Sequence, residues 1–158
     1  MDRFLGRHAK RIDAKGRVSV PAPFRAVLAR DGFEGLYAVR SPVLEAVEAG
    51  GNQLIAEIDG LLAHFDRFSP EYHALSIALL GAGDTLALDA EGRIVVPDWL
   101  RQATGIADEV VFVGLGTTFQ IWEPERFQRF ELQARETAAR LMRQSGPVRQ
   151  ASATGGTP

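Results

Sequence analysis

The feature that most constrains this chain is an internal repeat. The segment IDAKGRVSVPAPFR at 12–25 returns in altered form as LDAEGRIVVPDWLR at 88–101. A repeat of fixed period indicates two copies of one supersecondary unit. Seven aligned positions are identical: Asp13/Asp89, Ala14/Ala90, Gly16/Gly92, Arg17/Arg93, Val20/Val96, Pro21/Pro97 and Arg25/Arg101.

Each copy is predicted to form a hairpin turn, a short strand, a proline stop and a helix. In the first copy, Asp13 and Gly16 bound the turn, and Gly16 suits the left-handed position that closes such a loop. Pro21 ends the strand because it has no N–H to donate. In the second copy, Asp98 is predicted to cap the helix and Gly105 to end it. The predicted hairpin strands are 8–12 with 17–20 and 85–88 with 93–96.

A second strand pair is expected after the helix of each copy, and helices are expected between the copies and after them. The strand pairs are 36–40 with 44–48 and 110–114 with 119–123. The predicted organisation is a first repeat over 1–50, connecting helices over 51–82, a second repeat over 83–126, a C-terminal helix over 127–144 and a disordered tail over 145–158.

Composition narrows the class of protein. With 158 residues, 46% hydrophobic and 24% charged, the chain has the make-up of an ordinary globular protein. It has no cysteine, which excludes disulfides and thiolate metal sites. Neither a signal peptide nor a run of about twenty apolar residues is apparent, so a cytoplasmic protein is expected.

The positive charge is concentrated at the first copy. Residues 1–30 hold eight basic and two acidic residues, a net charge of +6, whereas residues 31–158 carry −8. Both lysines, Lys10 and Lys15, lie in the first segment. A local basic region on a hairpin is the electrostatic footprint of a nucleic-acid contact.

These residues resemble the MraZ family, two-repeat relatives of the AbrB/SpoVT/MazE swapped-hairpin DNA-binding proteins. The resemblance rests on the two turn motifs about seventy-five residues apart and spans about 4–141. Supporting motifs, in order, are Phe4-Leu-Gly6, Leu79-Leu-Gly81 and Trp122-Glu123.

The resemblance implies an α+β fold, a double-split β-barrel built from two interleaved repeats plus helices. It also implies a nucleoid-associated transcriptional regulator that forms a homo-oligomeric ring, an octamer or larger, and represses the cell-division and cell-wall gene cluster, including its own promoter, at repeated boxes of double-stranded DNA. The chain departs from the family at Glu91, where the first copy has Lys15, and at Tyr72, His73 and Ser76, where arginines are common.

Arginine in a two-stranded ribbon can read guanine in the major groove, because its fork matches the two acceptors of that base. We therefore predict DNA contacts at Arg17 and Lys15, with Arg11, Lys10 and Arg7 along the same ribbon and a weaker contact at Arg93. The alternative interpretation of Arg17 is structural: an arginine of the turn that is solvated and contacts no DNA. For Arg25 and Arg101 we predict structural ion pairs, Asp13–Arg25 and Asp89–Arg101.

Two other classes of function fit less well. An enzyme has little support: His8, His64 and His73 lack metal-ligand spacing, and we predict no catalytic residue, metal, cofactor or small-molecule substrate. An interaction module, either a ring-forming scaffold or an antitoxin without specific DNA binding, remains an alternative. The tail after Ser145 lacks the apolar anchors of a toxin clamp.

Overall fold

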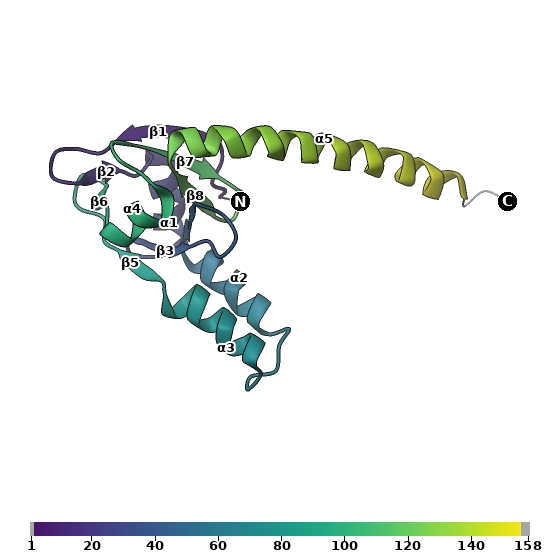
Figure 1. The fold of residues 1–158 in the computed structure, drawn as a ribbon, viewed down its shortest axis with the longest axis horizontal. Helices are drawn as coiled ribbons and strands as arrows, with labels where there is room; N and C mark the ends of the chain where they lie inside the picture. Colours follow the sequence, from purple (N-terminus) through teal and green to yellow (C-terminus); the bar gives the residue numbers. More distant parts are fainter. Residues whose placement is uncertain (1, 156–158) are drawn as a thin grey trace. The chain divides into compact units, whose positions relative to one another are not determined.

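The computed structural model describes the backbone of residues 2–155 and the side chains of residues 2–145 (Figure 1). The chain divides into two compact units, Met1–Pro124 and Glu125–Pro158. Both sequence repeats belong to the first unit. The second unit consists of helix α5 (Pro124–Gly155).

A six-stranded antiparallel sheet organises the first unit, in the order β1-β7-β8-β4-β3-β5. The strands are β1 (Arg7–Arg11), β3 (Leu36–Arg40), β4 (Val47–Gly50), β5 (Asp84–Leu86), β7 (Glu109–Gly114) and β8 (Phe119–Trp122). The result confirms an α+β fold with a mostly antiparallel sheet.

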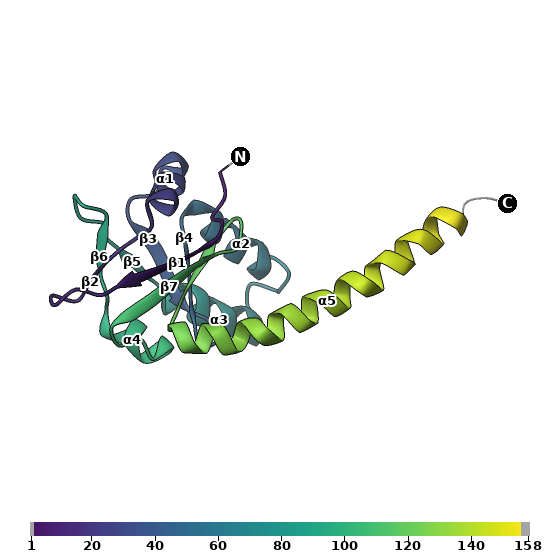
Figure 2. The ribbon, with the colours of Figure 1, turned by 90° about the horizontal axis from the view of Figure 1, so that it is seen from above.

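A separate two-stranded ribbon pairs β2 (Arg17–Ser19) with β6 (Arg93–Val95). Figures 1 and 2 both show these strands side by side. The prediction that β1 and β2 pair as a hairpin was therefore wrong, as was the equivalent prediction for β5 and β6. The turns form, but the strands diverge after them, because each finds its ladder partner in the other copy.

The two copies exchange strands in a symmetric way. β1 of the first copy pairs with β7 of the second, and β5 of the second pairs with β3 of the first. β2 and β6 are the same strand of the two copies. Neither copy completes its sheet alone, so the two repeats form one folding unit rather than two domains.

Inward-facing residues of both copies share one core. Val18 of β2 and Ile94 of β6 are paired in register and almost fully buried. Helices α1 (Ala22–Asp31) and α4 (Asp98–Thr104) add Phe24 and Leu100 to this core. Four phenylalanines form edge-on and tilted contacts at its centre: Phe4, Phe24, Phe112 and Phe119.

Three helical segments join the repeats: α2 (Asn52–Leu62), α3 (Pro70–Ser76) and a π-helical turn, η1 (Ile77–Gly81). Their apolar faces form a second cluster with Tyr37 and Val39 of β3. The Tyr37 hydroxyl donates a hydrogen bond of 2.6 Å to the carbonyl of Leu79. This bond fixes the end of the helical connection against the sheet.

Several boundaries differ from the predictions. β4 begins at Val47 rather than 44, because Ser41 Oγ accepts the amides of Val43 and Leu44 in a turn. The cap of α4 is Pro97, not Asp98, whereas Gly105 ends that helix in a left-handed conformation as predicted.

Helix α5 extends past the predicted boundary at 144 and reaches Gly155. This segment contains Ala, Gln and Arg, which favour helix formation. The prediction of a tail did not take their helix propensity into account. Residues 156–158 of that tail lie outside the described residues. Within 2–155, no helix is both long and apolar enough to cross a bilayer.

Candidate nucleic-acid interface

The first turn, Asp13–Arg17, is closed by its own aspartate. Asp13 Oδ1 accepts the amides of Lys15 and Arg17 at 2.9 Å each, and Asp13 Oδ2 accepts Arg17 Nε at 2.9 Å. Gly16, at φ 79°, closes the loop by donating its amide to the Asp13 carbonyl. The Asp13 carboxylate therefore binds both the backbone of the turn and the side chain of Arg17.

The second turn, Asp89–Arg93, repeats this geometry bond for bond. Asp89 Oδ1 accepts the amides of Glu91 and Arg93, and Asp89 Oδ2 accepts Arg93 Nε at 2.8 Å. Gly92 has the same φ of 79°. The identical residues of the repeat therefore encode the shape of the turn.

Because Nε is occupied, the terminal nitrogens of each arginine are the part of the fork left for a ligand. In the second turn Arg93 Nη1 lies 3.4 Å from Glu91 Oε2. In the first turn Lys15 takes the place of Glu91, and among residues 2–145 Arg17 pairs with no carboxylate other than that of Asp13. The two turns therefore share a shape but differ in charge.

The hydrogen bonds also perturb the acids. The amide of Arg17 is the main cause that holds the pKa of Asp13 below its usual value, helped by the Arg17 guanidinium and the Lys15 amide. The amide of Arg93 acts in the same way on the pKa of Asp89. Both carboxylates are therefore ionised near neutral pH and keep their arginines in place.

The predicted ion pairs Asp13–Arg25 and Asp89–Arg101 were wrong. Each aspartate binds the arginine four residues on, which the turn brings closer than the helix does. Arg25 Nε donates instead to the Val20 carbonyl at 3.1 Å, and Arg101 Nη1 donates to the Ala107 carbonyl at 2.8 Å.

Arg25 and Arg101 instead support the turn of the opposite copy. A Cβ placed on Gly92 would overlap the guanidinium of Arg25, and one placed on Gly16 would lie 3.9 Å from Arg101 Nη2. The amide of Val20 donates to the Gly92 carbonyl at 3.0 Å, and that of Val96 donates to the Gly16 carbonyl at 2.8 Å. Each turn is thus held by the partner repeat.

The structure divides the predicted basic residues between two sheets. Lys15 lies in the first turn, Arg17 begins β2, and β2–β6 pairing brings Arg93 onto the same ribbon. Arg7, Lys10 and Arg11 lie on β1, an edge strand of the six-stranded sheet. The prediction that they lie along the same ribbon as Arg17 was therefore wrong. Arg11 also lies 3.8 Å from Glu109, its register partner on β7.

Sequence reasoning missed Ser19 and Val95, which are exposed on the ribbon beside Arg17 and Arg93. Polar and apolar residues alternate over 17–20 in the sequence, but residues 94–96 of the second copy are all apolar. The pairing of β2 with β6 was not predicted, because a hairpin prediction pairs each strand with its neighbour in the chain.

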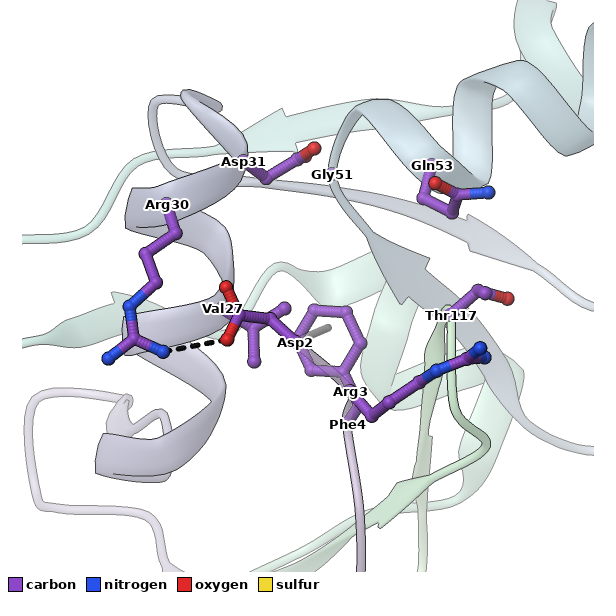
Figure 3. Close-up of a pocket in the computed structure, with 9 residues that line it drawn as sticks. All are labelled: Asp2, Arg3, Phe4, Val27, Arg30, Asp31, Gly51, Gln53 and Thr117. Atoms are coloured by element: carbon purple, nitrogen blue, oxygen red, sulfur yellow. Dashed lines mark hydrogen bonds and ion pairs between the residues drawn. The ribbon is translucent and has the colours of Figure 1, made fainter.

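A cavity of about 350 Å³ lies elsewhere in the first unit, between α1, the N-terminal segment and the start of α2 (Figure 3). Its charged residues hold the structure together. Arg30 Nη1 binds Asp2 Oδ1 at 2.7 Å, and Asp31 Oδ2 accepts the amide of Asn52 at the start of α2. The residues around the cavity are Asp2, Arg3, Phe4, Val27, Arg30, Asp31, Gly51, Gln53 and Thr117.

Other polar and aromatic residues that could in principle bind a ligand have structural surroundings. Asp84 accepts the Trp99 indole N–H at 3.3 Å, and Asp89 is bound to Arg93. Within the part of the chain whose side chains are described, no group of three or more His, Cys, Asp or Glu residues is placed to hold a metal ion. Phe119 lies in the apolar core, Trp99 packs against it and Trp122 is buried, so these rings do not form a base-stacking platform.

Known proteins are similar to this chain over most of its length. The family model that matches is that of the MraZ protein, whose description adds the comparison "antitoxin-like", and it covers residues 79–144. The chain is 50% identical over 150 residues to the transcriptional regulator MraZ of Beijerinckia indica, covering 94% of this chain and 92% of the relative.

Two further relatives with the same name are similarly close. That of Xanthobacter autotrophicus is 47% identical over 146 residues, covering 92% of this chain and 93% of the relative. That of Rhizobium meliloti is 44% identical over 136 residues, covering 86% of this chain and 93% of the relative. The similarity therefore includes both repeats.

Proposed function

The chain belongs to the MraZ family, and on that premise we propose that it is a DNA-binding transcriptional regulator that contacts its operator through the first turn and strand β2. The observation that carries the proposal is the state of Arg17. Asp13 accepts its Nε–H at 2.9 Å, and among residues 2–145 Arg17 has no second acidic partner of the kind that Glu91 provides for Arg93. A pre-positioned arginine loses less freedom when it binds.

The ribbon formed by β2 and β6 is the kind of element that fits the major groove, whose floor distinguishes all four base pairs. In this proposal Arg17 donates to the two acceptors of a guanine. Lys15 binds a base or a phosphate beside it. Arg93, with Glu91 at 3.4 Å, contributes less, because part of its charge is already matched.

Arg7, Lys10 and Arg11 are proposed as phosphate contacts on β1. Phosphate contacts set register and add to affinity without reading sequence. Because β1 lies in the other sheet, these residues would contact the DNA backbone outside the base pairs that the ribbon reads.

We also propose that the exchanged strands form the double-split β-barrel of the AbrB-like proteins, and that copies of the chain assemble into a ring. A ring presents several first turns to repeated boxes of DNA. Once one turn is bound, the others act at a high effective concentration, so weak single contacts add up. The proposed targets are the cell-division and cell-wall gene cluster and the chain's own promoter, and the proposed location is the cytoplasm, on the nucleoid.

The proposal is tested by fluorescence anisotropy with duplexes from the DNA upstream of the chain's own coding region. We expect binding that is tighter than to a scrambled duplex of the same composition and that weakens as salt rises. Light scattering on the same sample gives the mass of the assembly. A stable ring that binds neither duplex would favour a scaffold, and equal binding to both would contradict an operator-specific regulator.

A further inference from the structure

The exposed face of the β2–β6 ribbon consists of four side chains. Val18 and Ile94, paired in register, point into the core. Because successive side chains of a strand alternate between faces, the residues on either side of them point outward. These are Arg17 opposite Val95, and Ser19 opposite Arg93, and we call the four residues the ribbon face.

The backbone hydrogen bonds show how close these pairs are. The amide of Val96 donates to the Gly16 carbonyl, and the amide of Val20 donates to the Gly92 carbonyl. In an antiparallel ladder hydrogen-bonded and non-hydrogen-bonded pairs alternate, which makes Arg17/Val95 and Ser19/Arg93 non-hydrogen-bonded pairs. In such pairs the Cα atoms are about 4.5 Å apart and the side chains lie side by side.

Val95 is the apolar member of the ribbon face. Its side chain is 64% exposed, although the neighbouring Ile94 and Val96 are buried. A single exposed valine is common on protein surfaces and by itself requires no explanation. Its position directly opposite the arginine proposed to bind guanine gives it a specific neighbour when DNA is bound.

We propose that Val95 is a specificity-determining residue that packs against the C5-methyl group of a thymine within one base pair of the guanine bound by Arg17. This inference rests on the proposed function of the ribbon. Arg17 and Val95 lie side by side on the two strands of the ribbon, so Val95 would face a base pair beside the one that Arg17 contacts. The thymine methyl is the apolar group on the major-groove floor, and aliphatic side chains recognise it.

The other end of the ribbon face differs. There the residue opposite Arg93 is Ser19, which is polar, and Glu91 lies beside the arginine. A hydroxyl has no preference for a methyl group. The recognised sequence is therefore expected to depend on thymine at the Arg17 end and to lack that dependence at the Arg93 end.

Replacing thymine by deoxyuridine tests the proposal, because it removes the methyl group and leaves base pairing intact. In a duplex bound by the parent chain, each thymine is replaced in turn and the affinity is measured by anisotropy. We expect one or two positions at which the parent loses affinity about fourfold, the effect of one buried methyl group. Val95→Ala should bind the thymine duplex about fourfold more weakly and be indifferent to deoxyuridine at those positions.

Two variants separate this effect from folding. Val95→Thr keeps the β-branched shape that suits a strand and replaces one methyl by a hydroxyl, so it should show reduced sensitivity to deoxyuridine with unchanged thermal stability. Val43→Ala removes an exposed valine from the loop before β4 and should behave as the parent does.

The outcomes distinguish the inference from the proposed function. If Val95→Ala keeps the parent's sensitivity to deoxyuridine, or the parent shows none at any thymine, the role of Val95 is overturned while DNA binding stands. If the parent binds no duplex from its upstream DNA, the proposed function fails, and the inference fails with it.

Discussion

The turns of the two repeats have the same geometry and differ in charge. In each, an aspartate accepts two backbone amides and the Nε of an arginine, and a glycine adopts φ 79°. The first turn carries Lys15 where the second carries Glu91, and Glu91 lies 3.4 Å from Arg93. The geometry that the two turns share stabilises the fold. The difference between Lys15 and Glu91 distinguishes the turn proposed to bind DNA from the other turn.

The second turn has a structural role that does not depend on DNA. Its Gly92 carbonyl accepts the amide of Val20, and Arg25 of the first copy packs against Gly92. Strand β6, which follows it, pairs with β2. Losing the second turn would therefore displace the ribbon on which Arg17 stands.

The largest effect is expected when the first turn loses its arginine. Arg17→Ala removes a bidentate base contact worth about 1–3 kcal/mol, so affinity for the operator should fall roughly 5- to 150-fold and preference over a scrambled duplex should shrink. Lys10→Ala is the matched control. It should weaken binding to both duplexes alike and reduce the salt dependence.

Alanine substitution of the two turn glycines is expected to lower the free energy of unfolding by different amounts. A left-handed conformation costs a residue with a Cβ about 1–2 kcal/mol, so Gly16→Ala and Gly92→Ala should both lower the free energy of unfolding. Gly92→Ala should lower it more, because its Cβ overlaps Arg25. Urea denaturation at fixed protein concentration measures the difference.

Gly60 of α2 provides the control for that experiment. A Cβ there meets open space, so Gly60→Ala should leave stability unchanged or raise it by up to about 1 kcal/mol. A Gly16→Ala variant less stable than Gly92→Ala would contradict the packing of Arg25 against the second turn.

Removing the acid from the second turn should make the two turns more alike. Glu91→Gln releases Arg93 from an exposed ion pair with the Glu91 carboxylate and removes repulsion of phosphate. We expect DNA affinity to rise about two- to fivefold. Glu45→Gln, in the loop before β4, tests whether any lost negative charge has the same effect; a gain of equal size there would point to net charge alone.

The smallest difference between the turns is expected in their acid titration. The pKa of both Asp13 and Asp89 is lowered in the folded chain by the same set of hydrogen bonds. A lowered carboxyl pKa adds stability that is present above the unfolded pKa and is lost as pH falls through the folded pKa. Carbon-13 NMR of the carboxyl groups should show both acids titrating together, below their usual range; an ordinary pKa for one alone would break the equivalence.

The repeat allowed much of the local structure to be predicted. Turn aspartates and glycines, the proline stops, the helix end at Gly105 and strand β3 follow from residue types whose preferences are local. These features depend on neighbours in the chain, and the sequence displays those directly.

Strand partners and ion pairs could not be predicted in the same way. A turn sequence predicts a hairpin, but here β1 pairs with β7 and β2 with β6, since each copy completes its ladders with the other. Arg25 looked like a partner for Asp13 because both belong to one copy. In the structure Arg25 packs against Gly92, in the turn of the other repeat.

The central claim is that the first turn contacts operator DNA more strongly than the second. The most direct test compares Arg17→Ala and Arg93→Ala by anisotropy on one operator duplex, with both variants confirmed as folded by circular dichroism. The account predicts that the dissociation constant rises at least about fivefold for Arg17→Ala and less than about threefold for Arg93→Ala. Equal losses, or a larger loss for Arg93→Ala, would contradict it.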